Sequence, residues 1–219
     1  MSVSRAAALA EPAVEPAHLP RTIALDTEHY LLRTLEIGDI TERACGWFAD
    51  PTKARMINAP ARALTHAEFS DYIASHDRMS GHVLGIFEKP SLRFVGLWSA
   101  YIDWEYREFQ LNVMVGERLA NVSGAYYETD RVLQDYMFET LDLETLRCSC
   151  LARNTRMVER MAIAGLKPEH IDHVPSNSRE AFEEIHHYRV PKNLWRLIRG
   201  GRHVSDLIIA LCNAARAGI

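Results

Sequence analysis

Three strand-like runs follow one another between residues 82 and 117, and they constrain the fold more than any other feature of the chain. The runs cover residues 82–88, 92–103 and 107–117. Lys89, Pro90 and Ser91 separate the first two runs and form a short turn signal, which predicts an antiparallel hairpin.

Helical and strand-like patterns alternate on both sides of these three runs. The elements expected there are a strand at 29–37, helices at 39–50 and from residue 65, a helix after residue 124, a strand at 146–152, a helix at 155–165 and a strand at 182–190. Thr65 and Glu68 have capping-box spacing, Pro51 is expected to end the first helix, and Gly165 caps a later one. This order predicts an α/β (α+β) fold with a mixed sheet.

Length and charge exclude several classes of protein. The chain has 219 residues, so we expect one large domain, and a domain of this size buries roughly 70% of its unfolded surface. A net charge of −4 argues against a nucleic-acid partner, which would require a basic face. The longest apolar run near the end, residues 207–212, is too short to span a bilayer, and no signal peptide is visible. We expect no membrane partner and a cytoplasmic protein.

The two ends of the chain differ from the middle. Residues 1–25 are rich in Ala, Pro and Glu and are expected to form a disordered or loosely attached arm. Residues 26–191 would form the main domain. Residues 192–219 would form a C-terminal helical extension that includes a Gly-Gly hinge. The apolar stripe of that extension is expected to pack on the protein's own body or on a partner subunit, as in a homodimer; it comprises Val204, Leu207, Ile208 and Leu211.

The cysteines and histidines do not predict a metal site. Cys148 and Cys150 alternate within one expected strand, where buried thiols are more common than metal ligands. His170 and His173 have helical spacing but lack further ligands nearby. Four scattered cysteines form no disulfide framework, which favours a reducing compartment.

Three segments carry a resemblance to a known family. They are "VMVGERLANVSGAYYETDRVLQDYMF", "LRCSCLARNTRMVERMAIAGL" and "LRTLEIGDITERACGWFADP". The first has a strand, a turn, a loop and a helix with an early Glu, and the second has a strand, then Asn154, then a helix that closes with Gly165 eleven residues later. Over about residues 29–190 the chain resembles the GNAT superfamily of acyl-CoA-dependent N-acetyltransferases, most closely the branch of ribosomal-protein N-terminal acetyltransferases. The resemblance implies a mixed, largely antiparallel central sheet flanked by helices.

The resemblance also implies a site for coenzyme A. Backbone N–H groups at a helix N-terminus bind anions, so the loop would hold the pyrophosphate. By position the loop residues are Arg118, Asn121, Val122, Ser123, Gly124 and Ala125. Relatives have two glycines here, whereas this chain has Val122 at one of those positions. Asn154 would bind the pantetheine arm, although an Asn there is equally expected as a helix N-cap.

The implied chemistry is attack of a neutral amine on the thioester carbon. The resemblance places the oxyanion donor on the backbone of Val113, Met114 and Val115. Alternation puts Glu108, Gln110 and Asn112 on one strand face, and we consider Glu108 and Asn112 as catalytic candidates. The alternative to a catalytic role is that Glu108 is a charged residue at the end of the strand, exposed to solvent.

The proton donor to the departing thiolate is less evident. Relatives carry a Ser or a Tyr where this chain has Met157 and Met161, and neither methionine donates a proton. Of His186 and His187, alternation directs one toward the substrate side.

These features together predict an N-acetyltransferase with acetyl-CoA as co-substrate and no metal. Its acceptor would be an amine-bearing small molecule or a peptide N-terminus. The alternatives are a GNAT-fold acyl-CoA-binding sensor or interaction protein with little catalysis, and an assembly protein whose C-terminal helix docks a partner.

Overall fold

The structure is a computed structural model, and it describes residues 21–117, 122–176 and 182–200. Its strands form a single sheet in the order β1-β2-β3-β4-β5-β6-β8-β7. The strands are β1 (Ala24–Asp26), β2 (Tyr30–Thr34), β3 (Gly81–Glu88), β4 (Arg93–Asp103), β5 (Glu108–Val115), β6 (Thr145–Leu151), β7 (His170–Pro175) and β8 (Phe182–Pro191). All neighbouring strands are antiparallel except β5 and β6, which are parallel because α4 crosses over between them.

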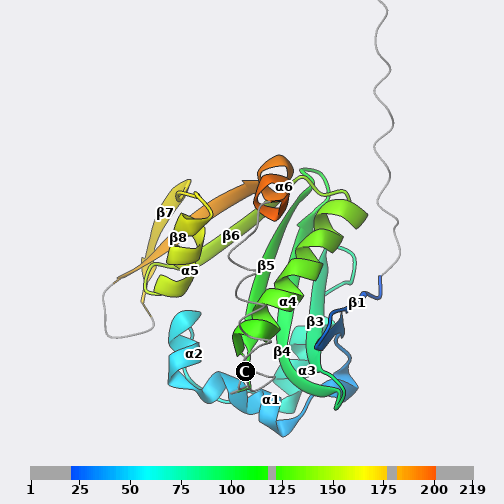
Figure 1. Ribbon diagram of the computed structural model, residues 1–219. Coiled ribbons are helices and arrows are strands. Elements are labelled where there is room, and N and C mark those ends of the chain that lie inside the picture. The colour runs from blue at the N-terminus through cyan, green and yellow to red at the C-terminus, as the bar shows by residue number, and fades with distance from the viewer. Residues whose placement is uncertain (1–20, 118–121, 177–181, 201–219) are drawn as a thin grey trace, which may run out of the picture.

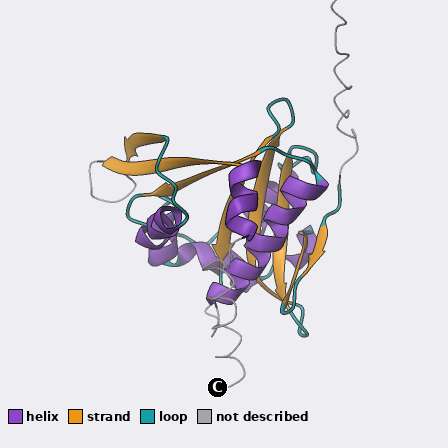
Figure 2. Ribbon diagram, turned by 45° about the horizontal axis from the view of Figure 1, so that its top comes forward, coloured by secondary structure: helices purple, strands orange, loops and turns teal. Residues whose placement is uncertain are grey.

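Helices cover both faces of this sheet (Figure 1). They are α1 (Glu42–Gly46), α2 (Pro51–Met56), α3 (His66–Ala74), α4 (Val122–Asp135), α5 (Thr155–Ile163) and α6 (Lys192–Gly200), with short turns η1 (Ile37–Asp39), η2 (Trp47–Ala49) and the π-helical η3 (Tyr136–Thr140). Figure 2 shows the helices packed against the two sides of the strands. None of the helices in the described part of the chain is long and apolar enough to span a membrane.

Two hydrophobic cores lie on opposite sides of the sheet. The larger core joins α4, η3 and α6 to the sheet and includes Trp98, Phe138 and Trp195. The smaller core joins α1 and α3 to the first strands and includes Trp47 and Phe69. Residues of β4 and β5 contribute to both cores in alternation, so these two strands fix which side chains face each helix layer.

The parallel pair is the weak point of the sheet. Among the described residues, the pairing of β5 with β6 covers only Glu108–Gln110 against Thr145–Arg147. Beyond Gln110, β5 continues to Val115 along β4 alone. Figure 1 shows β5 and β6 together near α6 and apart at their other ends. We call the region beside residues 111–115 the split.

Most elements agree with the sequence-based predictions, and three were missed. The hairpin of β3 and β4, the capping box of Thr65 and Glu68, and the positive φ of 75° at Gly165 confirm their predictions. The elements that were not predicted are β1, α2 and β7, whereas α6 lies at the start of the predicted helical extension. The first helical stretch ends before Pro51 as predicted, since Asp50 is extended. Pro51 also begins a new helix, α2, where its missing N–H costs nothing, and Asp50 caps that helix.

Both ends of the described chain contact the main body. Ile23 is 2% exposed and belongs to the larger core, although it falls within residues 1–25. Trp195 of α6 stacks on Phe138 with ring centroids 4.6 Å apart, so the start of the predicted C-terminal extension also packs on that core. The apolar stripe from Val204 to Leu211 lies outside the described residues.

Candidate active site

The backbone of β5 presents hydrogen-bonding groups to the split. The Gly116 N–H donates to Val95 of β4 over 2.9 Å, whereas the Arg107 carbonyl accepts from the Glu144 N–H on the other side over 2.7 Å. In a strand without bulges, backbone groups alternate sides, and the β4–β5 register runs without interruption. Odd-numbered residues of β5 therefore direct their N–H and C=O groups away from β4, so Val113 and Val115 face the split. Met114 faces β4 instead, and its side chain packs on the smaller core.

Helix α4 begins just after the split ends. Val122 is its first residue, and Gly124 and Ala125 are buried in its first turn. Its N-terminal N–H groups and its dipole therefore lie close in sequence to the end of β5, as an anion site requires. Two predicted loop residues, Arg118 and Asn121, lie outside the described part of the chain.

The start of the connection to α4 is held by α1 and α2. The Trp47 indole donates to Glu117 over 3.0 Å, and Arg43 pairs with the same carboxylate at 3.2 Å. The Lys53 ammonium donates to the Gly116 carbonyl. Two of the segments that carry the family resemblance thus contact each other, and the early helices fix where β5 ends.

Helix α2 also reaches the β6–β8 side of the split. The Asn58 amide, just beyond α2, donates to the Pro175 carbonyl at the end of β7 over 3.1 Å. Arg153, which follows β6, lines a small cavity of about 200 Å³ together with α2 residues such as Pro51 and Ala54. In Figure 1, α2 lies below α5, across from the end of β5. The segment from α1 to Asn58 therefore contacts both arms of the split.

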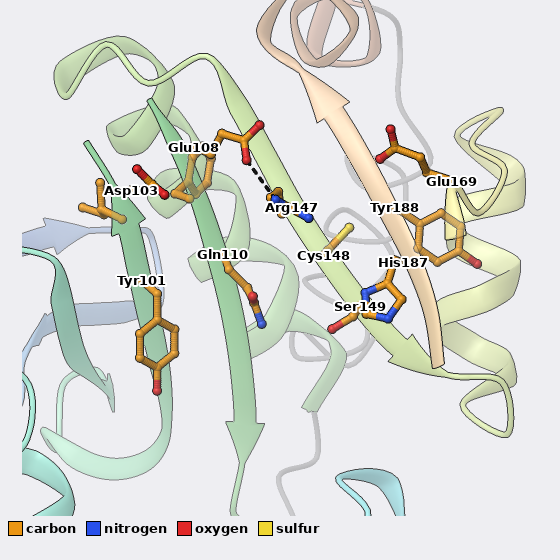
Figure 3. A pocket seen from close by; sticks show the side chains of 12 residues that line it. Tyr101, Asp103, Glu108, Gln110, Arg147, Cys148, Ser149, Glu169, His187 and Tyr188 are labelled. Carbon is orange, nitrogen blue, oxygen red and sulfur yellow. Dashed lines mark hydrogen bonds and ion pairs between the residues drawn. The ribbon is translucent and has the colours of Figure 1, made fainter. Parts of the chain in front are cut away.

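A cavity of about 530 Å³ lies on the sheet face opposite α4, beside the last paired residues of β5 and β6 (Figure 3). Its polar lining includes Tyr101 and Asp103 of β4, Glu108 and Gln110 of β5, Arg147 and Ser149 of β6, Glu169, and His187 of β8. The predicted alternation of β5 is confirmed here. Glu108 and Gln110 line this cavity, while Phe109 packs in the larger core and Leu111 and Val113 pack against it.

Glu108 is buried and bound by two arginines. One carboxylate oxygen accepts from Arg189 of β8 over 2.6 Å, and the other accepts from Arg147 of β6 over 3.2 Å. A proton from an incoming amine would have to compete with both ion pairs. Asn112 is exposed on β5 beyond the cavity lining, and its side-chain oxygen accepts from Gln110 over 3.3 Å.

Asn154 caps helix α5. Its side-chain oxygen accepts from the Met157 N–H at 3.4 Å, which is the N-cap role expected of an Asn after a strand. The sulfur atom of Met157 in turn lies 3.9 Å from the hydroxyl of Tyr126 in α4. A phenol from α4 therefore reaches the position where relatives carry a serine.

An ion pair with a buried carboxylate joins α4 to α5 behind this phenol. Asp130 and Arg160 approach to 2.5 Å, and Arg160 also contacts the Tyr126 hydroxyl. Burial raises the pKa of Asp130 to about 7 and lowers the pKa of Arg160 to about 10, and the contact between the two groups opposes both shifts because each charge favours the other. The pair holds the two helices that flank the split on this side of the sheet.

The cysteines of β6 are not suited to nucleophilic or metal chemistry. Burial raises the pKa of Cys148 to about 12, and burial also raises the pKa of Cys150. Both therefore remain thiols at neutral pH. No group of three or more His, Cys, Asp or Glu side chains suited to a metal ion occurs within residues 21–117, 122–176 and 182–200.

His187, rather than His186, lines the cavity. Its Nε2 lies 2.9 Å from Asp172 of β7, and that carboxylate also contacts His170 at 2.7 Å. His186 is directed to the opposite face and lies near Tyr188. As strand alternation requires, only one of the two histidines lines this cavity, and whether that side receives the substrate stays a prediction.

Several polar residues that line the cavity were not predicted as site residues, among them Tyr101, Asp103, Arg147 and Ser149. A signal for them was present. Ser99, Tyr101 and Asp103 are the polar positions of an otherwise apolar strand, and they alternate. Arg147 and Ser149 alternate in the same way with the two cysteines.

The comparisons with known proteins agree with this geometry. The family profile described as "Acetyltransferase (GNAT) domain" matches residues 29–167, which is more than half of the chain. The chain belongs to the GNAT acetyltransferase family. No curated protein matches this GNAT chain in a sequence search.

Solved structures show the same fold in other GNAT proteins. The ribosomal-protein-S5-alanine acetyltransferase from Vibrio fischeri is 15% identical with a TM-score of 0.62, and the match covers 79% of this chain and 98% of that one. The spermidine N-acetyltransferase from Vibrio cholerae, solved with CoA and spermine, is 13% identical with a TM-score of 0.65, covering 78% and 99%. A GCN5-related N-acetyltransferase from Brucella melitensis is 14% identical with a TM-score of 0.64, covering 89% and 86%. At these identities the likeness concerns the GNAT fold.

Proposed function

We propose that this GNAT protein transfers an acetyl group from acetyl-CoA to a primary amine by direct attack in a ternary complex. The observation that carries the proposal is the split. Within the described residues, a stretch of β5 leaves its backbone groups on one side without a partner strand and leads to the N-terminus of a 14-residue helix. Coenzyme A fits such a site. The strand offers hydrogen-bond partners to the amides of its pantetheine arm, and the helix N-terminus offers an anion site to its pyrophosphate.

The backbone of Val113 and Val115 would serve the thioester. Their N–H groups face the split, and a preorganised N–H donor stabilises the oxyanion that forms when an amine attacks the carbonyl. Such a donor needs no reorganisation during the reaction, since the ladder with β4 holds the strand in place.

The cavity on the face opposite α4 would receive the amine. The cavity adjoins Gln110, the last residue of β5 that pairs with β6. An acceptor bound there would lie next to the point where β5 and β6 separate, which we call the apex of the split. Its lining contains three carboxylates, from Asp103, Glu108 and Glu169. Glu108 is already paired with Arg147 and Arg189, so Asp103 and Glu169 are the carboxylates that would favour a cationic acceptor. In this arrangement Glu108 and Asn112 would orient the acceptor.

Tyr126 would supply a proton to the departing thiolate. Its hydroxyl lies beside Met157, and the adjacent guanidinium of Arg160 would stabilise the developing phenolate. A thiol with a pKa near 8.5 is already a fair leaving group, so this contribution is the smaller one.

Calorimetric titration with acetyl-CoA, followed by a thiol-release assay, tests the proposal. The acceptor panel contains spermidine, spermine, an alanyl peptide and an amino sugar, since the similar structures are named for polyamine and alanine acetylation. We expect binding and turnover with at least one cationic amine. Binding without turnover on any acceptor would favour the acyl-CoA-binding sensor, and no binding would exclude both functions.

A further inference from the structure

Helix α3 places a tyrosine and a histidine over β4 beside the acceptor cavity. Tyr72 and His76 lie four residues apart and therefore share one face of the helix. The Tyr72 hydroxyl lies 2.5 Å from the Ser99 hydroxyl, and His76 Nε2 lies 3.2 Å from the Tyr101 hydroxyl. The ring centroid of His76 lies 4.9 Å from that of Tyr72 and 5.4 Å from that of Tyr101. The three rings thus form one packed group.

The backbone fixes the tautomer of His76. Its Nδ1 lies 2.8 Å from the Tyr72 carbonyl oxygen, which can only accept a hydrogen bond. In the neutral imidazole the proton must therefore reside on Nδ1. This leaves the lone pair of Nε2 directed at Tyr101, whose hydroxyl donates to it. A histidine held in this way is poised to take a second proton through Nε2.

Tyr101 connects this imidazole to the cavity. It lines the cavity and pairs across the sheet with Gln110, at the apex of the split (Figure 3). Tyr72 serves a different purpose, because burial raises its pKa to about 12 and its hydroxyl is engaged with Ser99. Tyr101 is partly exposed, at 42%, so its hydroxyl is open to an acceptor as well as to His76.

We propose that Tyr101 and His76 form a proton relay that deprotonates the acceptor amine during acetyl transfer, an inference that rests on the proposed function. As the amine nitrogen bonds to the thioester carbon, its N–H proton passes to the Tyr101 oxygen. The Tyr101 hydroxyl proton passes at the same time to His76 Nε2. The C–S bond then breaks, the thiolate leaves, and the imidazolium releases its extra proton to water. Tyr101 is the catalytic residue here, and His76 is a positioning residue that acts through it.

The surroundings of His76 are suited to this cycle. The groups that face it are Tyr72 from its own helix, Tyr101 from β4 and His82 from β3. Burial lowers the pKa of His82, so that imidazole is neutral at pH 7 and adds no competing charge. The adjacent Asp77 carboxylate accepts from the N–H groups of Met79, Ser80 and Gly81 and is occupied by them. None of the described groups named here that face His76 is a fixed cation.

His76→Asn separates a structural role from a relay role. The asparagine amide can still donate to the Tyr72 carbonyl, but nothing remains at the Nε2 position to accept a proton. Tyr101→Phe breaks the relay from the other side and keeps the ring. We expect each variant to lower kcat/KM by about 10²-fold, the usual range for general base catalysis, with the acetyl-CoA Kd unchanged. The double variant should be no worse than either single one.

The pH profile provides the readout that packing alone would not move. In the unaltered protein kcat/KM should rise with pH, and the limb that depends on the relay should disappear in His76→Asn. The assay uses the panel amine that the unaltered protein acetylates. Turnover with both variants at the unaltered rate and with the unaltered profile overturns the relay alone. No turnover by the unaltered protein on any panel amine overturns the relay together with the proposed function.

Discussion

The indole of Trp47 lies directly over Gly116, so closely that a Cβ atom on Gly116 would be 1.8 Å from the ring. The contact joins η2, which directly follows α1, to the residue that directly follows β5. Only a glycine lets the strand pass beneath the indole, and the indole N–H then reaches Glu117. The end of the split is thereby fixed against the early helices.

Gly116→Ala should therefore disturb both stability and cofactor binding. The added methyl must displace Trp47, and overpacking of this kind costs about 1–3 kcal/mol. We expect a lower urea midpoint and a weaker calorimetric Kd for acetyl-CoA. Gly46→Ala is the matched control, since a Cβ there meets nothing within 4 Å and the residue is helical. Equal stability of the two variants would show that the indole contact does not constrain the strand.

Val113→Pro tests the backbone donor. Proline removes the N–H that faces the split but leaves the ladder to β4 intact, because the Val113 N–H takes no part in that ladder. We expect kcat to fall about 10²–10³-fold, as when an oxyanion donor is lost. Val113→Ala keeps the N–H and controls for the lost side chain. Similar losses of kcat in both variants would assign the effect to packing instead.

Gly124→Val and Glu108→Gln should separate binding from turnover. Gly124 is buried in the first turn of α4, so a branched side chain there should raise the Kd of acetyl-CoA by about tenfold or more, or about 1.4 kcal/mol. Glu108→Gln should leave that Kd unchanged. It weakens the interactions with Arg147 and Arg189 and should slow turnover because the acceptor amine is less well oriented. Calorimetry and the thiol assay measure the two effects. The reverse pattern would exchange the assigned roles.

Asp130→Asn should be strongly destabilising. The Asp130 side chain is 8% exposed, and the variant removes the counter-charge of Arg160 at this buried position, where breaking an ion pair costs up to about 3–5 kcal/mol. Asp135→Asn is the control on the same helix. Its partner Arg199 is at the same distance, 2.5 Å, but the Asp135 side chain is 35% exposed, and loss of this pair should cost less than about 1 kcal/mol. Urea denaturation compares the two variants, and equal costs would contradict the role of burial.

The cap of α3 should be sensitive to acid. Hydrogen bonds from Arg62, then from the Thr65 N–H and hydroxyl, lower the pKa of Glu68 to about 2 from its usual value near 4.5. The folded-state pKa is depressed, so the stabilisation is complete above the unfolded value and is lost as the pH falls from about 5 toward 2. The Thr65 amide resonance should follow this titration in NMR spectra. In Glu68→Gln the resonance should not move over that range; if it titrates as before, another group controls the cap.

Local patterns were sufficient for the middle of the fold. Strands β3 to β5 are long and alternate, and their turn is short, so the sequence predicts both the hairpin and the faces of Glu108 and Gln110. Strand β7 was missed because its side chains are exposed or half-buried on both faces and show no apolar alternation. Helix α2 was missed because Asp50-Pro51 was interpreted as a stop signal, although the same pair also starts helices.

The ion pairs of Glu108 could not be predicted from such patterns. They depend on the register between β5, β6 and β8, and α4 and α5 separate these strands in the sequence. A parallel register is set by the packing of the crossover helix and not by a turn. The relay geometry is likewise non-local, since His76 meets Tyr101 only through the docking of α3 on β4. The roles of the loop residues and of Asn154 toward acetyl-CoA stay predictions.

The short pairing of β5 with β6 has a consequence for cooperativity. Three residue pairs connect the two parts of the sheet there, and α6 adds a second connection through Trp195 and the pairs Arg196–Glu139 and Arg199–Asp135. Both of these lie at one end of the sheet, and away from that end the two parts are also joined through side chains, by the Asp130–Arg160 pair and the Asn58–Pro175 hydrogen bond. Strands β6 to β8 should thus open as a separate unit in native-state hydrogen exchange, with a lower free energy than β2 to β5. A ligand seated in the split would merge the two units into one.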